Sequence, residues 1–372
     1  MWEGIYQNIS KIIERDSKVT TYKFALLRGV IDIIQDNSPY ISFSGDRVHF
    51  PTGLIVEKWI LYYYPILESS TNIPQINGEA NLAFIQPLSN LILFYKERGG
   101  FSAFYNDLKT KGIPDSIKQN FIALALKLQD TITRMPMKHI GYSISNAHYS
   151  IFNFQIYKPG KNITLHVDRQ FLINNLGQFS IPIEYFEVFK ILGSFIGGQD
   201  SILFKWAEFS VKASGKSLSI ENVINEVLRS PITERDITES RKIYNSILKK
   251  ESKVYCVWTG KAIAKYDVDH MIPFSAWKNN DLWNLLPSQK TINNQKRDRI
   301  PSPEVIHKRK DLILYYWDLV NQCQPERFQK EIQVALLGNH TFSSWQDISI
   351  NQLQANCKYL ITNRGFDEWK PK

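Results

Sequence analysis

The stretch that decides the fold of this chain runs from Tyr255 to Pro301. In one-letter code it reads YCVWTGKAIAKYDVDHMIPFSAWKNNDLWNLLPSQKTINNQKRDRIP. It contains the pair Asp269-His270, a single Asn284, and the pair Asn293-Asn294. Carboxylate, imidazole and amide groups at such short spacing suggest a chemical site and not only a packed core.

Three kinds of side chain in this stretch suit chemistry on a phosphodiester. The oxygens of Asp269 and of an asparagine amide are ligands that hard divalent cations prefer. The imidazole of His270 can take a proton from water near neutral pH. Basic side chains that can hold phosphate follow them. These are Lys296, Arg297 and Arg299. The combination is that of a one-metal nuclease site.

The stretch resembles the HNH (ββα-metal) endonuclease family over residues 251–302. It is most similar to the variant in the nuclease domain of CRISPR RNA-guided effectors, in which Asp-Val-Asp-His is followed by one Asn and then by another. Here Asn284 lies fourteen residues after His270, and Asn293 lies twenty-three residues after it. A lone Asp-His pair is a weak signal, whereas this spacing with trailing basic residues is specific.

The resemblance implies a β-hairpin followed by a helix, with a metal ion between them. The sequence regions that would correspond to the hairpin strands are 255–257 and 266–268, and the helix would span 292–299. We therefore expect a ββα-metal module inside a chain of the α+β class.

The resemblance also implies roles for single residues. Asp269 and Asn293 would ligate Mg²⁺ or Mn²⁺, and the spacing selects Asn293 over its neighbour Asn294. His270 would deprotonate the attacking water, and Asn284 would hold the loop that aims His270. The expected catalytic residues are thus His270, Asn284 and Asn293. The expected nucleic-acid-binding residues are Lys296, Arg297 and Arg299.

One departure from the family concerns zinc. Many HNH proteins carry two Cys-x-x-Cys pairs that bind a structural zinc ion. This chain has only Cys256 at the first pair, and Gln289 and Ile292 stand near the second. Four zinc ligands cannot be assembled there. We expect no structural zinc, with Trp258 and neighbouring apolar residues packing in its place.

The net charge of +9 is concentrated around the motif. Residues 249–310 hold thirteen Lys or Arg and six Asp or Glu, whereas the remainder holds 32 basic and 30 acidic residues. A local excess of positive charge favours a polyanionic partner. The alternative is a solvated basic face, but beside this motif the charge favours nucleic acid.

Composition excludes several other classes of protein. Of the 372 residues 43% are hydrophobic and 22% are charged, which is typical of a globular chain and not a disordered one. No apolar run is long enough to suggest a membrane helix. Three scattered cysteines make no disulfide framework, and the first residues do not resemble a signal peptide. We expect a cytoplasmic protein with no membrane partner.

Periodicity divides the chain into four regions. Residues 1–138 are mainly helical, and at 1–69 the order helix, helix, hairpin, helix fits either a winged-helix-like module or a packing module with an aromatic core. Residues 139–230 are mixed, with two strand-like runs about a turn at Lys158-Pro159-Gly160-Lys161. Residues 231–302 form the nuclease module, which a helix over 233–250 would lead into. Helices in 303–372 would brace it.

The sequence thus predicts a metal-dependent HNH endonuclease that hydrolyses DNA, with a role in phage defence or restriction suggested by the family. One HNH site cuts one strand, so cleavage of a duplex would need a protein partner or a second copy. Two alternatives stay open. One is a DNA-binding or partner-docking protein with a degenerate HNH fold, and the other is a nuclease that cleaves RNA.

Overall fold

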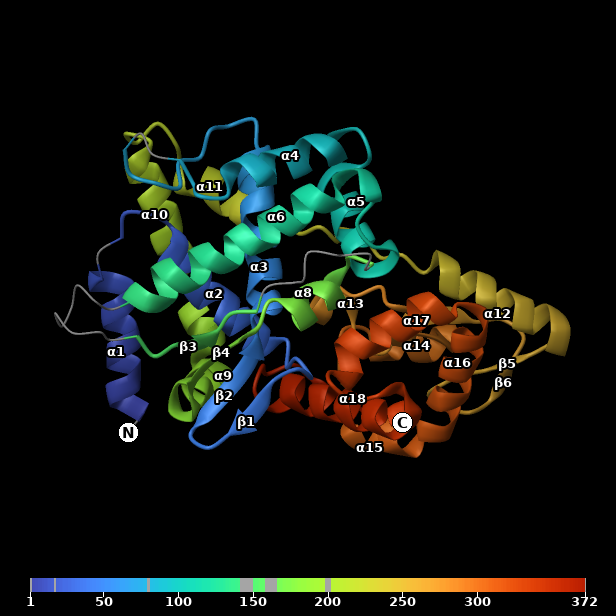
Figure 1. Cartoon of the computed structure of the whole chain (residues 1–372). Coiled ribbons are helices and arrows are strands. Elements are labelled where there is room, and N and C mark those ends of the chain that lie inside the picture. Colours follow the sequence, from blue (N-terminus) through green and yellow to red (C-terminus); the bar gives the residue numbers. More distant parts are fainter. Residues whose placement is uncertain are drawn as a thin grey trace. The chain divides into compact units, whose positions relative to one another are not determined.

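The computed structural model describes residues 2–16, 18–78, 81–140, 150–157, 166–197 and 202–371 (Figure 1). Its contacts divide the chain into two compact units. The N-terminal unit comprises 1–36 and 41–231, and the C-terminal unit comprises 37–40 and 232–372. The finer division into four regions remains a prediction.

The N-terminal unit consists mostly of helices and contains one small sheet. Its helices are α1 (Trp2–Arg15), α2 (Tyr22–Gln35), α3 (Thr52–Glu68), α4 (Ile85–Lys96), α5 (Gly100–Asn106), η1 (Asp107–Lys111), α6 (Asp115–Ile132), η2 (Thr133–Met137), α8 (Arg169–Asn175), α9 (Ile183–Gly197), α10 (Phe204–Ala213) and α11 (Ile220–Val227). Its strands are β1 (Ser42–Ser44), β2 (Arg47–Pro51), β3 (Asn153–Gln155) and β4 (Gln178–Pro182).

Helix α3 is the centre of the N-terminal unit. It packs against α2, α6 and α8, which lie around it in Figure 1. Because neighbours surround it, its side chains are apolar on nearly every face. Trp59, Tyr62, Tyr63 and Tyr64 are all buried. These aromatic residues therefore form a packed interior and leave no exposed platform for base stacking.

The sheet of this unit joins segments that are far apart in the chain. Strands β1 and β2 form the hairpin expected within residues 1–69, with its turn at Gly45-Asp46, and the strand order is β1-β2-β4-β3 with antiparallel pairing. The pairing of β2 with β4 places parts of the two N-terminal sequence regions in one sheet. The predicted turn at 158–161 and residues 163–165 lie outside the described residues.

The C-terminal unit has short strands and a group of helices. Its helices are α12 (Thr238–Glu251), α13 (Phe274–Trp277), η4 (Leu282–Asn284), α14 (Lys290–Lys296), α15 (Pro303–Lys308), α16 (Lys310–Cys323), α17 (Pro325–Ile332), η5 (Gln333–Leu337), η6 (Phe342–Ser344) and α18 (Trp345–Thr362). Its strands are β5 (Val254–Tyr255), β6 (Ala262–Ile263), β7 (Asp267–His270), β8 (Leu285–Ser288), β9 (Ile300–Pro301) and β10 (Glu368–Trp369).

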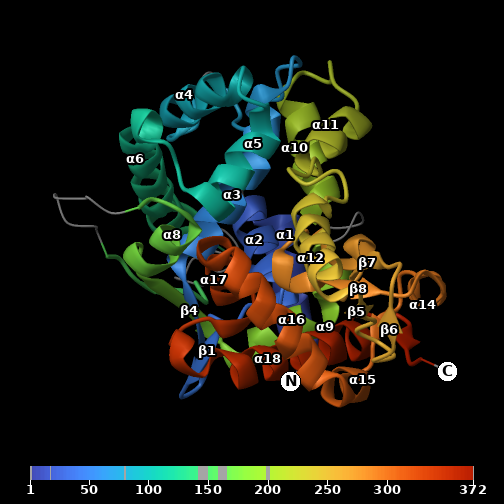
Figure 2. The same cartoon turned by 90° about the vertical axis from the view of Figure 1, so that its right-hand side faces the viewer.

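The ββα unit at the site is made of β7, β8 and α14, which gather in Figure 2. Strand β7 pairs with β8 in antiparallel register, with His270 opposite Leu285. Of the two regions expected to approach the hairpin strands, 266–268 leads into β7, whereas 255–257 lies outside this hairpin. Strand β5 instead pairs with β6 across a short turn, and the backbone N–H of Val257 donates to the carbonyl of Pro287 in β8 at 2.9 Å.

The helices after residue 302 share one core with the nuclease module. This core includes large buried aromatic side chains, and they come from both parts of the unit. They are Tyr244, Trp258, Trp283, Tyr316, Trp317, Phe328, Trp345 and Trp369. The indole N–H of Trp317 donates to the carbonyl of Trp283 at 2.7 Å. The C-terminal helices thus pack directly on the segment that carries the motif.

The α+β class predicted from the sequence is confirmed, since helices predominate and the sheets are small. In the part of the chain that the structure describes, the strand pairs are antiparallel except β9 with β10, which is parallel. Among the described residues, no helix combines the length and the apolar character that crossing a bilayer requires.

The hydroxyl of Tyr316 gives a test of how α16 supports the module. It accepts from the N–H of Tyr255 and donates to the carbonyl of Tyr255, both at 2.7 Å. Tyr316→Phe would leave both backbone groups unpaired at a cost of about 1–3 kcal/mol. We expect hydrogen exchange of the β5 peptide to accelerate by about 5- to 150-fold.

The neighbouring Tyr315→Phe is the matched control, because Tyr315 is exposed on the same helix. It should leave exchange in β5 unchanged. Equal exchange rates in wild type and Tyr316→Phe would contradict the supporting role of this hydroxyl.

Candidate active site

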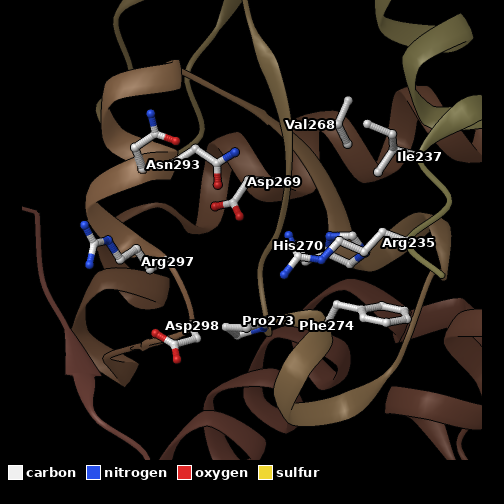
Figure 3. Close-up of a pocket in the computed structure, with 11 residues that line it drawn as sticks. Arg235, Ile237, Val268, Asp269, His270, Pro273, Phe274, Asn293, Arg297 and Asp298 are labelled. Atoms are coloured by element: carbon white, nitrogen blue, oxygen red, sulfur yellow. The ribbon is translucent and has the colours of Figure 1, made fainter. Parts of the chain in front are cut away.

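Strand β7 ends in the two residues that the motif analysis singled out. Asp269 and His270 are both buried, and both line a pocket of about 820 Å³. Successive residues of a strand point to opposite sides. In Figure 3 Asp269 accordingly lies on the side of Asn293 and Arg297. His270 lies on the side of Arg235.

Both oxygens of the Asp269 carboxylate accept hydrogen bonds inside the protein. The indole N–H of Trp258 donates to Oδ2 at 2.6 Å. The Lys296 ammonium lies 3.1 Å from Oδ1, and it also donates to the carbonyl of His270 at 2.7 Å. The side chain of Lys296 is completely buried. Lys296 thus neutralises Asp269 in this structure, and its predicted contact with phosphate remains a prediction.

The imidazole of His270 has Asn280 and Phe274 as side-chain neighbours. Its Nε2 lies 3.1 Å from Oδ1 of Asn280, and its ring packs edge-on against Phe274 at 5.7 Å between centroids. Burial lowers the pKa of His270 below its ordinary value, although the bond to Asn280 and the charge of Asp269 oppose the shift. The ring is therefore neutral near pH 7 and able to accept a proton.

Asn284 is fully buried and bonds to the backbone directly after the motif. Its Oδ1 accepts from the N–H of Ile272 at 2.8 Å, and its Nδ2 donates to the carbonyl of Ile272 at 2.9 Å. Its own carbonyl accepts from the N–H of Met271 at 2.7 Å. These bonds pin the segment that follows His270. The predicted contribution of Asn284 to catalysis would act through His270.

Helix α14 presents the two adjacent asparagines. Asn293 is half-buried and Asn294 is exposed, and both line the pocket. The helix ends at Lys296, and Arg297 adopts a positive φ of 53° that is uncommon outside glycine. This turn leaves Arg297 in the pocket lining. The choice of Asn293 as the metal ligand is still a prediction.

Arg299 is placed differently from Arg297. Its guanidinium donates to the carbonyl of Lys296 at 3.4 Å and also to the carbonyl of Gln295. It thereby satisfies carbonyl groups in the last turn of α14 that have no partner within the helix. A contact between Arg299 and phosphate remains a prediction.

The pocket includes residues that the sequence analysis missed. Arg235 and Phe274 line it, and the Arg235 guanidinium lies 6.0 Å from the centre of the Phe274 ring. A helix was expected over 233–250, but α12 begins only at Thr238, so 233–237 is free to approach the pocket. Asp236, which accepts from the N–H of Thr238 at 2.9 Å, is a helix-start signal that could have shown this.

A divalent cation fits the donors of this pocket. A carboxylate can accept about four hydrogen bonds or ligands, so the bonds from Trp258 and Lys296 leave acceptor capacity on Asp269. In the described part of the chain no three or more His, Cys, Asp or Glu side chains are grouped to hold a metal ion. A cation here would depend on Asp269, amide oxygens and water, as Mg²⁺ sites commonly do.

The positions of the family's zinc cysteines are filled by packing. Cys256 is buried, and its Sγ accepts from the N–H of Gln289 at 3.3 Å. The ring of Trp258 packs against Trp369 at 5.2 Å between centroids, and Ile292 is half-buried against the same core. The expectation that the module folds without zinc is a prediction.

Two family models match the chain. Residues 256–302 match the model described as HNH endonuclease, and residues 3–227 match the model described as domain of unknown function DUF8808. No curated protein and no solved structure matches the chain. The HNH match supports a nuclease-type hydrolase in general. The longer match covers more than half of the sequence, so the chain belongs to the DUF8808 family, and an HNH-type module follows that domain.

Proposed function

We propose that the protein is a metal-dependent endonuclease that hydrolyses phosphodiester bonds in DNA. The observation that carries the proposal is that Asp269, His270 and Asn293 line one pocket within the segment that matches HNH endonucleases. Arg235 and Arg297 line the same pocket and supply positive charge for a phosphate.

Each residue of the site has its own role in the proposed reaction. Asp269 and Asn293 would hold Mg²⁺ or Mn²⁺ through side-chain oxygens. Such a cation, when bound, stabilises the charge that develops on the phosphate and on the leaving 3′ oxygen. His270 takes the proton of the attacking water, because burial keeps its imidazole neutral. Asn284 holds the backbone after His270 so that the imidazole keeps its place.

Lys296 supports the site through two buried contacts, one to Asp269 and one to the backbone of His270. Its ammonium offsets the charge of Asp269 when no cation is bound, and it fixes the backbone carbonyl of His270. A buried carboxylate without a partner would be costly. We therefore assign Lys296 to holding the site together and Arg297 to contact with the phosphate.

The preference for DNA and the biological role rest on resemblance and charge. The asparagine at 293 matches the variant seen in CRISPR RNA-guided effectors, and the basic excess over 249–310 suits a polyanion. A defence or restriction role in the cytoplasm follows by analogy with free-standing HNH proteins. A duplex cut would need a protein partner or a second copy of this chain.

One observation favours the alternative of a non-catalytic DNA-binding protein. The Lys296 ammonium already forms an ion pair with Oδ1 of Asp269, and Asp269 is a proposed metal ligand. A degenerate site could retain this ion pair and bind DNA without cutting it. The cleavage experiment below separates the two functions, and parallel DNA and RNA substrates separate the two kinds of nuclease.

Cleavage of plasmid DNA should require Mg²⁺ or Mn²⁺ and should depend on His270. We expect His270→Ala to slow cleavage by about 10²- to 10⁴-fold, the usual contribution of a general base. DNA binding should persist, since the proton acceptor adds little affinity. The exposed His307→Ala is the control and should cut like wild type. Undiminished cutting by a contaminant-free His270→Ala preparation would refute the assignment.

The two adjacent asparagines should differ in effect. Asn293→Ala should lower the cleavage rate by about 100-fold or more, because several kcal/mol of charge stabilisation depend on the held cation. Asn294→Ala should retain substantial activity. Rates measured over a Mn²⁺ titration test this. If Asn294→Ala is inactive and Asn293→Ala active, the ligand assignment on α14 is off by one residue.

Salt dependence should locate the path of the DNA. Binding is measured by fluorescence anisotropy in the His270→Ala background, and log affinity is plotted against log salt. Loss of one phosphate contact through Arg297→Glu should flatten the slope by about 1. Arg364→Glu, with the same charge change outside the pocket, is the control. A slope that Arg297→Glu leaves unchanged would place the phosphates elsewhere.

A further inference from the structure

The turn that precedes Asn284 contains a second asparagine, which touches the imidazole of His270 itself. Oδ1 of Asn280 lies 3.1 Å from His270 Nε2, and Nδ2 of Asn280 donates to the carbonyl of Glu234 at 2.9 Å. Asn280 is half-buried. It thus stands between the His270 ring and the irregular segment before α12.

The carbonyl of Glu234 decides which way the Asn280 amide faces. A backbone carbonyl can only accept a hydrogen bond, so the NH₂ group of Asn280 must face it. The opposite orientation would set two acceptor oxygens against each other. The amide oxygen of Asn280 therefore faces the His270 ring. The orientation follows from the Glu234 carbonyl alone, which removes the usual ambiguity between amide O and N.

The amide oxygen in turn decides which ring nitrogen of His270 carries the proton. An amide oxygen only accepts, so Nε2 of the neutral ring must be the N–H donor. The lone pair then lies on Nδ1. No hydrogen bond joins Nδ1 to a side chain or backbone group in the described ranges, and His270 is one of the residues that line the pocket.

We propose that Asn280 is a positioning residue that holds His270 as the Nε2–H tautomer, so that Nδ1 is the atom that takes the proton from the attacking water. This rests on the proposed nuclease function. On transfer, the water O–H bond breaks, its electron pair stays on the attacking oxygen, and the proton joins Nδ1 to give an imidazolium. The Asn280 oxygen then continues to accept from Nε2–H, so the hydrogen bond survives the step.

The turn is built to keep Asn280 in place. Asn279 bonds Asp281 twice, through Oδ1 to the backbone N–H at 2.7 Å and through Nδ2 to the carboxylate at 2.8 Å. The N–H of Leu282 then donates to Glu331 at 2.6 Å. Asn284 fixes the backbone after His270, whereas Asn280 contacts the ring. The two asparagines thus act on different parts of the same residue.

The test observes the ring directly and does not depend on cleavage. Full-length protein with ¹⁵N-labelled histidine is studied by NMR above the ordinary pKa of histidine, about 6.5. Wild type should show a His270 Nε2–H that exchanges slowly with water. Asn280→Ala should lose that protection, and Asn280→Asp, whose carboxylate also accepts, should retain the Nε2–H tautomer. A wild-type ring protonated at Nδ1 would overturn the proposal, whether or not the protein cuts DNA.

Kinetics provide the second readout. Asn280→Ala should lower kcat by about 10- to 100-fold, the usual effect of losing a partner that orients a functional group, with little change in KM. Asn280→Asp should recover much of the loss. Asn279→Ala loosens the same turn but keeps the Asn280 amide, so it should disturb the His270 ring less than Asn280→Ala does. Equal ring spectra and equal loss of kcat in Asn279→Ala and Asn280→Ala would mean that the shape of the turn matters and the hydrogen bond does not.

Discussion

The buried ion pair between Lys296 and Asp269 is the interaction on which the site in the C-terminal unit depends. It joins helix α14 to strand β7, two elements whose paired residues lie 27 positions apart in the chain. Either charge left alone in this interior would cost about 3–5 kcal/mol. The same ammonium also fixes the carbonyl of His270. One lysine therefore joins the helix that carries Asn293 to the strand that carries Asp269 and His270.

Trp258 supports the same carboxylate through a hydrogen bond and through the packing of its ring. The Trp258 indole donates to the second oxygen of Asp269, while its ring packs against Trp369 near the chain's C-terminal end. Trp258 thus connects the site to the core that the C-terminal helices share. In HNH proteins with four zinc-binding cysteines, a zinc ion would hold the corresponding part of the structure. Here the side chains that surround Cys256 occupy that place.

His270 is supported in two physically different ways. Asn284 holds the backbone that follows it, and Asn280 holds its ring. Backbone support limits where the imidazole can be, whereas the contact to Nε2 limits which tautomer it adopts. A proton acceptor needs both constraints, since a ring in the right position with the wrong nitrogen protonated has no lone pair to offer.

The sequence by itself determined the helices, the α+β class and the nature of the module. Helical periodicity is local, and the spacing of His270, Asn284 and Asn293 is a property of the chain alone. The match of residues 256–302 to the HNH endonuclease model confirms that this segment is of the HNH type. The residues of the pocket that could be foreseen are those that the motif itself contains.

Only the tertiary structure decided the strand pairing and the environment of each side chain. β7 pairs with β8 across the connection 271–284, and no local pattern distinguishes that partner from the nearer segment at 255–257. Lysine is usually exposed, so the burial of Lys296 depends on a carboxylate brought to it by folding. Arg235 meets Phe274, and Glu234 meets Asn280, for the same reason. Their contacts join residues far apart in sequence, and such contacts exist only once the chain has folded.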